Sequence, residues 1–170
     1  MNQQQEYLSN SILLLNLNYL VLLRLHIRQV SSFQNLLAKL FLERAIVRAS
    51  GILLAEAVTR EAVANSDGGP VVILEKFCPW QGVVIKEAPN ALFIVFPAIT
   101  GDWRIQCIPP SLGSRDKRKP LPAAWGGLAG EALQSESGVD DAVFCHVGLF
   151  IGGASTREGA LALAELAVQA

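Results

Sequence analysis

The sequence has 170 residues, which is enough for one domain or for one domain with an appendage. Its 14 basic and 15 acidic residues give a formal net charge of −1, which excludes a general attraction to nucleic acid or anionic membranes. Any anion site must therefore be local. Because only 17% of the residues are charged and 51% are hydrophobic, we expect a surface buried against another domain or another copy.

Three cysteines, Cys78, Cys107 and Cys145, stand far apart in the chain and are odd in number. This pattern argues against a disulfide scaffold, so we expect an intracellular, reducing compartment.

Residues 12–25 form an apolar stretch that Asn16 and Asn18 interrupt. A membrane-spanning helix needs about 20 apolar residues, so this stretch is too short and we expect no membrane partner. The first basic residue is Arg24, which does not fit a secretory signal. We interpret the stretch as a buried or partner-facing helix, with a signal anchor as the alternative.

The composition changes abruptly near residue 38. Residues 1–37 contain no Gly, Pro, Ala, Asp or Lys, whereas the chain from Ala38 onward is rich in Ala and Gly. We predict an atypical hydrophobic leader over 1–37 and a domain over 38–170. The leader is interpreted as a gene-model artefact, such as an intron read in frame, and a genuine appendage is the alternative.

The remaining elements follow in chain order. Apolar residues at steps of four and seven predict a helix over 36–62, and the turn residues 65–69 end it. Short apolar runs starting at 71, 83, 92 and 103 predict strands, followed by a polar loop over 109–122. A helix over 128–136, a strand over 142–147 and a helix from Thr156 complete the order. This order predicts an α+β domain with a mostly antiparallel or mixed sheet and flanking helices.

A Gly-Gly corner, Gly152 and Gly153, precedes the last helix. We predict that Ser155 caps this helix in a capping box with Glu158. The unpaired N–H groups and partial positive charge of a helix N-terminus suit a phosphate, which two glycines would let approach and Arg157 would help to hold. The alternative is a tight turn with an ordinary cap.

His146 follows Cys145 in an apolar strand. Alternation places His146 on the face opposite Cys145, from which it can donate a hydrogen bond to a phosphate near the glycines. A structural histidine is the alternative. Zinc is not expected, because the chain has two histidines and its cysteines are far apart in sequence.

Two further groups of residues suit nucleic acid. The basic run “SRDKRK” at 114–119 fits phosphate contact or nuclear import, and a solvated loop is the alternative. Trp80, Trp103 and Trp125 can stack on bases, but core packing is the simpler expectation. No sequence motif joins a nucleophile to its base, so the residues by themselves indicate a binding module.

Five stretches, taken together, resemble the C-terminal half of the melanocyte-proliferating-gene (MYG) family. These are the DHH-type metal-dependent 3′→5′ RNA exonucleases, also catalogued as metal-dependent protein hydrolases. The resemblance covers about residues 38–170. Its stretches are “LEKFCPW” (74–80), “GDWRIQCIP” (101–109), “LPAAWGGL” (121–128), “SGVDDAVFCHVGLFIGG” (137–153) and “STREGALALA” (155–164).

The resemblance implies a two-domain enzyme. Its N-terminal DHH domain would hold divalent metal, usually taken as manganese, and its C-terminal DHH-associated domain would close the cleft and hold RNA. It also implies a nuclear, cytosolic or mitochondrial location. No D-H-H triplet or aspartate-rich metal motif occurs in the 170 residues. We therefore expect no catalytic residue, metal or cofactor in this chain, and no hydrolysis by it alone.

By this resemblance the glycine pair grips a phosphate or terminal nucleotide. His146 matches the strand-end histidine of the family, Arg104 its Trp-Arg step and Thr156 its helix start. The expected substrate-binding residues are Gly152, Gly153, Ser155, Thr156, Arg157, His146 and Arg104. The sequence departs from the family pattern at Gly126, Gly148, Leu149 and Ala154, and this puts tight substrate binding in doubt.

The expected function is the RNA- or phosphate-binding part of a truncated exonuclease, with the DHH catalytic domain as its partner. The alternative is a non-enzymatic interaction or dimerisation domain that forms a homo-oligomer through the apolar N-terminal helix.

Overall fold

The computed structural model describes residues 32–170, so the apolar stretch 12–25 lies outside the described residues. The chain divides into two compact units, residues 1–50 and residues 51–170. In the first unit, the described residues belong to helix α2 (Ser32–Asn65), which continues into the second unit. No described helix is both long and apolar enough to cross a membrane.

Helix α2 confirms the helix expected over 36–62 and extends beyond it at both ends. Gly51 does not interrupt it. In the second unit, its residues Ala55, Thr59 and Ala62 are buried. The helix ends at a turn in which Asp67 and Gly68 take positive φ values of 48° and 72°, a conformation that Asp and Gly tolerate better than most residues.

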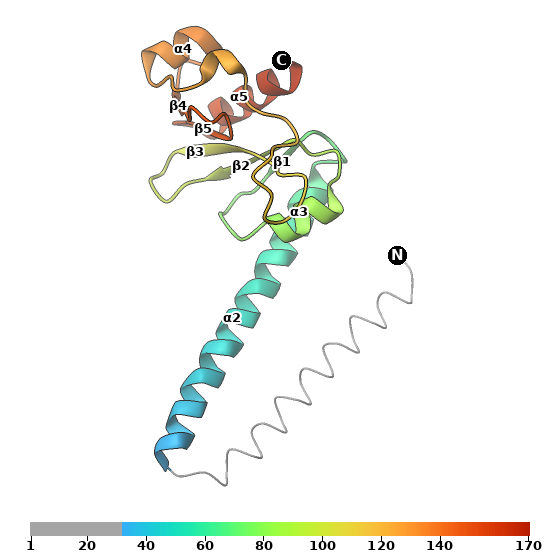
Figure 1. The fold of residues 1–170 in the computed structure, drawn as a ribbon, viewed down its shortest axis with the longest axis vertical. Helices are drawn as coiled ribbons and strands as arrows, with labels where there is room; N and C mark the ends of the chain where they lie inside the picture. Colours follow the sequence, from blue (N-terminus) through green and yellow to red (C-terminus); the bar gives the residue numbers. More distant parts are fainter. Residues whose placement is uncertain (1–31) are drawn as a thin grey trace. The chain divides into compact units, whose positions relative to one another are not determined.

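A five-stranded sheet forms the centre of the second unit (Figure 1). Its spatial order is β1-β2-β3-β5-β4, with β1 and β2 parallel and the other neighbours antiparallel. The α+β class and the mostly antiparallel, mixed sheet are thus confirmed. The strands are β1 (Val71–Ile73), β2 (Phe93–Pro97), β3 (Trp103–Cys107), β4 (Ala142–Cys145) and β5 (Ile151–Ala154).

Two elements differ from the sequence predictions. The apolar run at 83, predicted as a strand, is helix α3 (Gln81–Glu87), and its Val83 and Val84 are buried. A short apolar run between prolines fits one helical turn as well as a strand, and packing decides between them. The Gly-Gly corner is also not a corner, because Gly152 and Gly153 lie inside strand β5.

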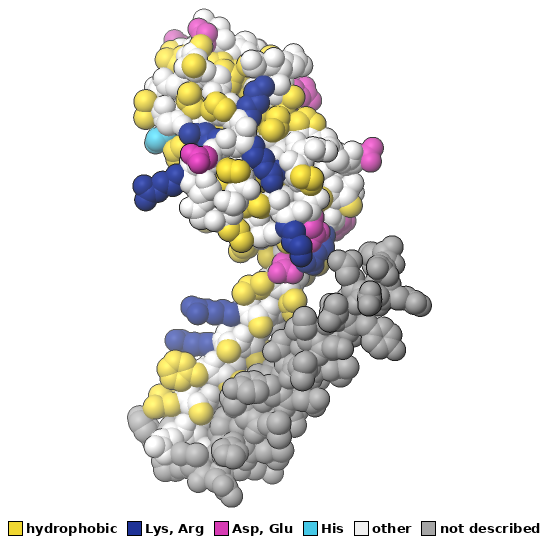
Figure 2. All heavy atoms as spheres, turned by 45° about the vertical axis from the view of Figure 1, so that its right-hand side comes forward, with side chains coloured by type: hydrophobic (Ala, Val, Ile, Leu, Met, Phe, Trp, Pro, Cys, Tyr) yellow, Lys and Arg dark blue, Asp and Glu magenta, His cyan; other side chains and the backbone are white. Residues whose placement is uncertain are grey.

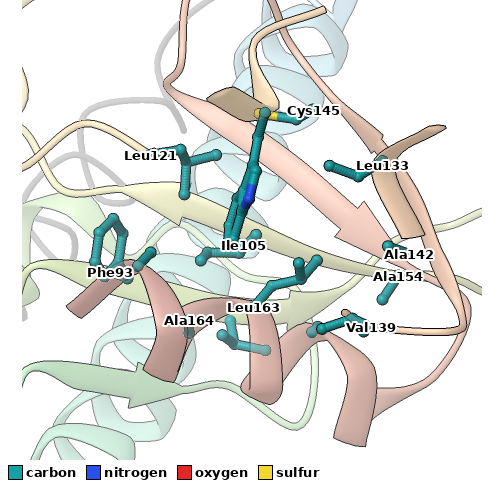
Figure 3. Packing of buried hydrophobic residues seen from close by; sticks show 14 of the residues in the cluster. Phe93, Ile105, Leu121, Leu133, Val139, Ala142, Cys145, Ala154, Leu163 and Ala164 are labelled. Atoms are coloured by element: carbon teal, nitrogen blue, oxygen red, sulfur yellow. The ribbon is translucent and has the colours of Figure 1, made fainter. Parts of the chain in front are cut away.

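One face of the sheet packs on helix α5 (Arg157–Gln169), as Figure 3 shows. The η1 turn (Ala123–Trp125) and helix α4 (Glu131–Ser137) add Trp125 and Leu133 to the same core. We call this the inner face. Its buried side chains include Phe93, Val95, Ile105, Cys107, Cys145, Ala160, Leu163 and Ala164.

The opposite, outer face has a second core at the β1–β2 side. There Val72, Ile94 and Phe96 pack with Trp80 and with Val84 of α3. Further along the same face, toward β5 and β4, the side chains of Arg104, Gln106, Phe144 and Ile151 are only partly buried. Polar and aromatic side chains therefore lie on this half of the outer face.

Candidate functional site

Arg104 lies on the outer face and is held by the turn before β3. Its Nη2 donates to Asp102 Oδ2 at 2.7 Å, and Thr100 completes the group through its hydrogen bond to Asp102. The guanidinium carbon lies 4.6 Å from the centre of the Phe144 ring, within range of a cation–π interaction. In the described part of the chain, Arg104 Nε and Nη1 have no hydrogen-bond acceptor, so they can donate to a ligand.

Gly153 lies beneath this arginine. A Cβ at position 153 would be 2.9 Å from Arg104 Nη1, 2.9 Å from the Trp103 carbonyl oxygen and 3.1 Å from Phe144 Cε1. The register pairs Gly153 with Arg104 on β3 and with Phe144 on β4. Position 153 must therefore be glycine for the guanidinium and the ring to occupy their observed places.

The role expected of the glycine pair changes accordingly. Strand β5 pairs with β3 on one side and β4 on the other, so its backbone amides face other strands rather than a ligand. A Cβ at Gly152 would point to the inner face, toward Ile105 and Leu121. Gly153 thus belongs to the outer face with Arg104, whereas Gly152 belongs to the core.

The N-terminus of α5 already holds a carboxylate. Asp141 Oδ2 accepts hydrogen bonds from the Thr156 N–H at 2.8 Å and from the Thr156 hydroxyl at 2.5 Å. The Thr156 hydroxyl in turn accepts from the Gly159 N–H at 3.0 Å, so Thr156 is the N-cap. The prediction of a capping box at Ser155 was wrong, because Ser155 instead donates its backbone N–H to the Asp141 carbonyl oxygen.

Arg157 does not join Arg104. It forms an ion pair with Glu75 at 3.1 Å, and its guanidinium lies 5.9 Å from the centre of the Trp103 ring. Trp103 packs against the inner core, so the two members of the Trp103–Arg104 step point to opposite faces. The expected substrate residues are therefore split between two places.

His146 is exposed just after β4. Its Nδ1 accepts the Gly148 N–H at 2.9 Å, which leaves the proton of the neutral ring on Nε2, and its ring lies 4.6 Å from the Phe150 ring. Cys145 is buried in the inner core, while its neighbour Phe144 contacts Arg104 on the outer face. His146 thus offers one N–H donor at the end of the strand that carries Phe144.

The basic run 114–119 has a structural use that the sequence did not reveal. Arg118 donates to the carbonyl oxygens of Ala88 at 2.7 Å, Ala91 at 2.8 Å and Ile85 at 3.0 Å, around the end of α3. Lys119 donates to the Val168 carbonyl oxygen at 2.8 Å in the last turn of α5. Burial lowers the pKa of Arg118 from its ordinary value. Two of the four cations therefore stabilise helix ends.

Most of the cysteine and tryptophan side chains are packed in the two hydrophobic cores. Burial raises the pKa of the Cys107 and Cys145 thiols to about 11, which keeps them neutral. Trp80 and Trp125 are buried, which confirms core packing for these two. Within residues 32–170, no three His, Cys, Asp or Glu side chains are grouped so as to hold a metal ion.

The arrangement that can bind an anion is thus Arg104 on its Phe144 and Gly153 support. Sequence reasoning found Arg104 and Gly153, but it did not include Phe144 or Asp102. The signal for both was present, because Asp102 stands two residues before Arg104 and Phe144 shares the alternation of the outer face.

Comparisons with a family model and with known proteins point to the same family. The MYG1 exonuclease family model, described as an uncharacterised protein family (UPF0160), matches residues 26–168. The chain is 38% identical to the human protein named MYG1 exonuclease over 136 residues, which cover 74% of this chain and 36% of that protein. It is 32% identical to the MYG1 protein of Dictyostelium discoideum over 147 residues, which cover 81% of this chain and 45% of that protein. The chain therefore matches less than half of the length of either relative. No solved structure matches the chain.

Proposed function

The chain belongs to the MYG1 exonuclease family, and from this membership we propose that its sheet unit is the RNA-binding part of a 3′→5′ exonuclease. In this proposal the chain corresponds to the C-terminal half of a DHH-type enzyme. The catalytic domain and its divalent metal, expected to be manganese, belong to the part of the relatives that the chain does not match. The described residues do not fit such a metal, so no step of phosphodiester cleavage is assigned to them.

The observation that supports the proposal is that the Arg104 side chain is held in place on one edge and keeps N–H donors on the other. Asp102 and Thr100 fix one edge of its guanidinium, while Nε and Nη1 keep N–H donors for a ligand. A planar guanidinium of this kind suits a phosphate oxygen, and an adjacent aromatic ring suits a sugar or base. Arg104 therefore acts as the phosphate contact, with Phe144 and Gly153 as its support.

This assignment also explains how a chain with almost no net charge can bind a phosphate. The N-terminus of α5 is neutralised by Asp141, and Arg157 is neutralised by Glu75. Arg104 is also paired, with Asp102 through Nη2, but its Nε and Nη1 keep N–H donors on the outer face, so it can contact an anion without a global positive field.

The test measures the affinity of the 170-residue chain for a single-stranded RNA that carries a fluorophore at its 5′ end. Fluorescence anisotropy reports the bound fraction, and the titration is repeated at several salt concentrations. Arg104→Met should weaken binding about tenfold, since hydrogen bonds to charged groups contribute about 1.5–3 kcal/mol. It should also reduce the slope of log K against log salt by about 0.7, the value for one phosphate contact on a single strand.

Arg48→Met is the matched control, because Arg48 is exposed on α2, where no RNA contact is proposed. It should change binding little. Absence of RNA binding by the unmodified chain, or an Arg104→Met variant with unchanged affinity and slope, would overturn the proposal.

A second candidate is an interaction or dimerisation module. Along α2 the exposed large apolar side chains include Leu36, Leu40, Phe41, Val47 and Leu54, and Figure 2 shows hydrophobic side chains on the surface of this helix. Such exposure is typical of helices that pack on a partner. Sedimentation of the chain before and after Leu40 and Val47 are changed to Gln tests this role, and a monomer in both cases would remove its support.

A further inference from the structure

A cavity of about 470 Å³ lies on the outer side of the second unit, next to the Arg104 site. Residues 52–56 of α2, residues 77–80 before α3 and the first residues of α3 contribute to its walls, together with Leu112 and Gln106 of β3. The lining is mainly apolar. Its volume falls in the range of small-ligand sites.

Strand β3 carries residues of both the cavity and the Arg104 site. Gln106 lies two residues after Arg104, so the two side chains point to the same face, about 7 Å apart along the strand. Gln106 lines the cavity, whereas Arg104 does not. A ligand that contacts both side chains must therefore have a group that binds the Arg104 guanidinium and a second group that enters the mainly apolar cavity.

The side chains that line the cavity indicate which part of such a ligand would occupy it. No Lys or Arg lines the cavity, and the Glu56 carboxylate at its wall already pairs with Arg60 at 3.0 Å, so the lining offers no free cation to a phosphate. Gln81 and Gln106 supply amides that both donate and accept, and Phe77 supplies a ring that is 58% exposed. Amides, a carboxylate and a ring together suit a nucleobase.

We infer that this cavity is a base-binding subsite for the nucleotide next to the one whose phosphate contacts Arg104. The inference rests on the proposed function. The base stacks on Phe77, whose ring packs on Phe96 at 5.2 Å between centres and is thereby kept in place. The Gln106 amide pairs with the edge of the base, since among the described residues this amide has no hydrogen-bond partner.

Cys78 provides a direct probe, because it lines the same cavity and is only partly buried. A base in the cavity covers its thiol and slows alkylation. Cys107 and Cys145 are buried elsewhere in the inner core and serve as internal references. The probe is a short single-stranded oligoribonucleotide, compared with an abasic oligomer of the same length that keeps the phosphates.

Two substitutions separate the base from the phosphate. Phe77→Ala should weaken binding of the oligoribonucleotide about thirtyfold, the middle of the range for loss of one stacked base, and Gln106→Met should weaken it about fivefold, the effect of one lost hydrogen bond. They should leave the salt slope and the affinity for the abasic oligomer unchanged, because neither side chain is charged. Gln169→Met, at an exposed position on α5, is the matched control.

The expected result is that the oligoribonucleotide slows alkylation of Cys78 at least fivefold in the unmodified chain, and that the abasic oligomer does not. Binding that depends on Arg104 but leaves Cys78 unprotected and is insensitive to Gln106→Met overturns the inference and leaves the proposed function intact. A chain that binds neither oligomer overturns both.

Discussion

The carboxylate of Asp141 occupies the space that a side chain at position 159 would fill. A Cβ built on Gly159 meets Asp141 Oδ1, and the same carboxylate accepts the two hydrogen bonds from Thr156 that start α5. The positive end of this helix is therefore satisfied by a negative charge from the loop before β4.

Gly159→Ala should destabilise the protein, although alanine favours a helix over glycine by about 1 kcal/mol. The added methyl group displaces Asp141, and overpacking of this kind costs about 1–3 kcal/mol. Urea denaturation measures the change. Gly82→Ala in α3, where no atom lies within 4 Å of the new Cβ, should not destabilise the protein. If shortening Asp141 to Ala fails to reduce the cost of Gly159→Ala, the explanation is wrong.

Arg118→Met should lower the free energy of unfolding by about 1–3 kcal/mol, because three carbonyl oxygens lose a charged donor. Thermal denaturation of this variant and of Arg115→Met, which stands in the same basic loop, checks the prediction. Equal melting temperatures for the two variants would show that Arg118 does not stabilise the end of α3.

Gly153→Ala and Gly152→Ala should both reduce stability, but only Gly153→Ala should reduce the RNA affinity of the folded protein. The first places a methyl group against Arg104 and Phe144 on the outer face, so RNA affinity should fall about as far as in Arg104→Met. The second points toward Ile105 and Leu121, so it should reduce stability while the folded fraction keeps its affinity. Circular dichroism gives the concentration of folded protein for each variant, and anisotropy then gives the RNA affinity of that folded protein. Together they distinguish a loss of affinity from a loss of stability. Equal loss of affinity in both variants would contradict the assignment of faces.

The two buried thiols predict a loss of stability in alkali. Their pKa in the folded protein is about 11, above the ordinary value of 9.0, so the unfolded chain releases these protons first. Stability from this source is complete below pH 9 and falls between about pH 9 and 11, by about 1.4 kcal/mol per pH unit for each thiol. Urea titrations at pH 8, 9 and 10 measure it. A variant with Cys107 and Cys145 both changed to Ala should show a shallower fall, and an equal fall would refute the prediction.

Much of the fold could be predicted from the sequence, because runs such as 93–97 and 103–107 are apolar, of strand length and bounded by turns. The run at 83 was ambiguous, since Val83 and Val84 fit a strand by propensity, and the burial of Val84 with Trp80 in the second core favours the helix. Strand β5 was missed because two of its four residues are glycines, which rarely occupy strands unless a neighbour requires the space.

The candidate site was harder to predict. Arg104 and Gly153 were both found, but their meeting depends on β5 lying beside β3, which is a property of topology. The phosphate-binding turn was expected because glycines before a helix resemble one, whereas the helix start uses Asp141, 15 residues before Thr156. A long-range carboxylate leaves no local signal in the sequence.

The position of β5 has a consequence for how the protein is made. Strand β5 is the last strand in the chain, yet it lies between β3 and β4 and joins them. As the chain leaves the ribosome, β4 can pair only with residues 127–130, which bond to its other edge, until residues 151–154 reach it. The sheet, and with it the pairing of Arg104 with Gly153, is therefore completed only after residues 151–154 have been synthesised. A nascent chain halted before residue 151 would present β4 as an unpaired edge, the kind of surface that chaperones protect.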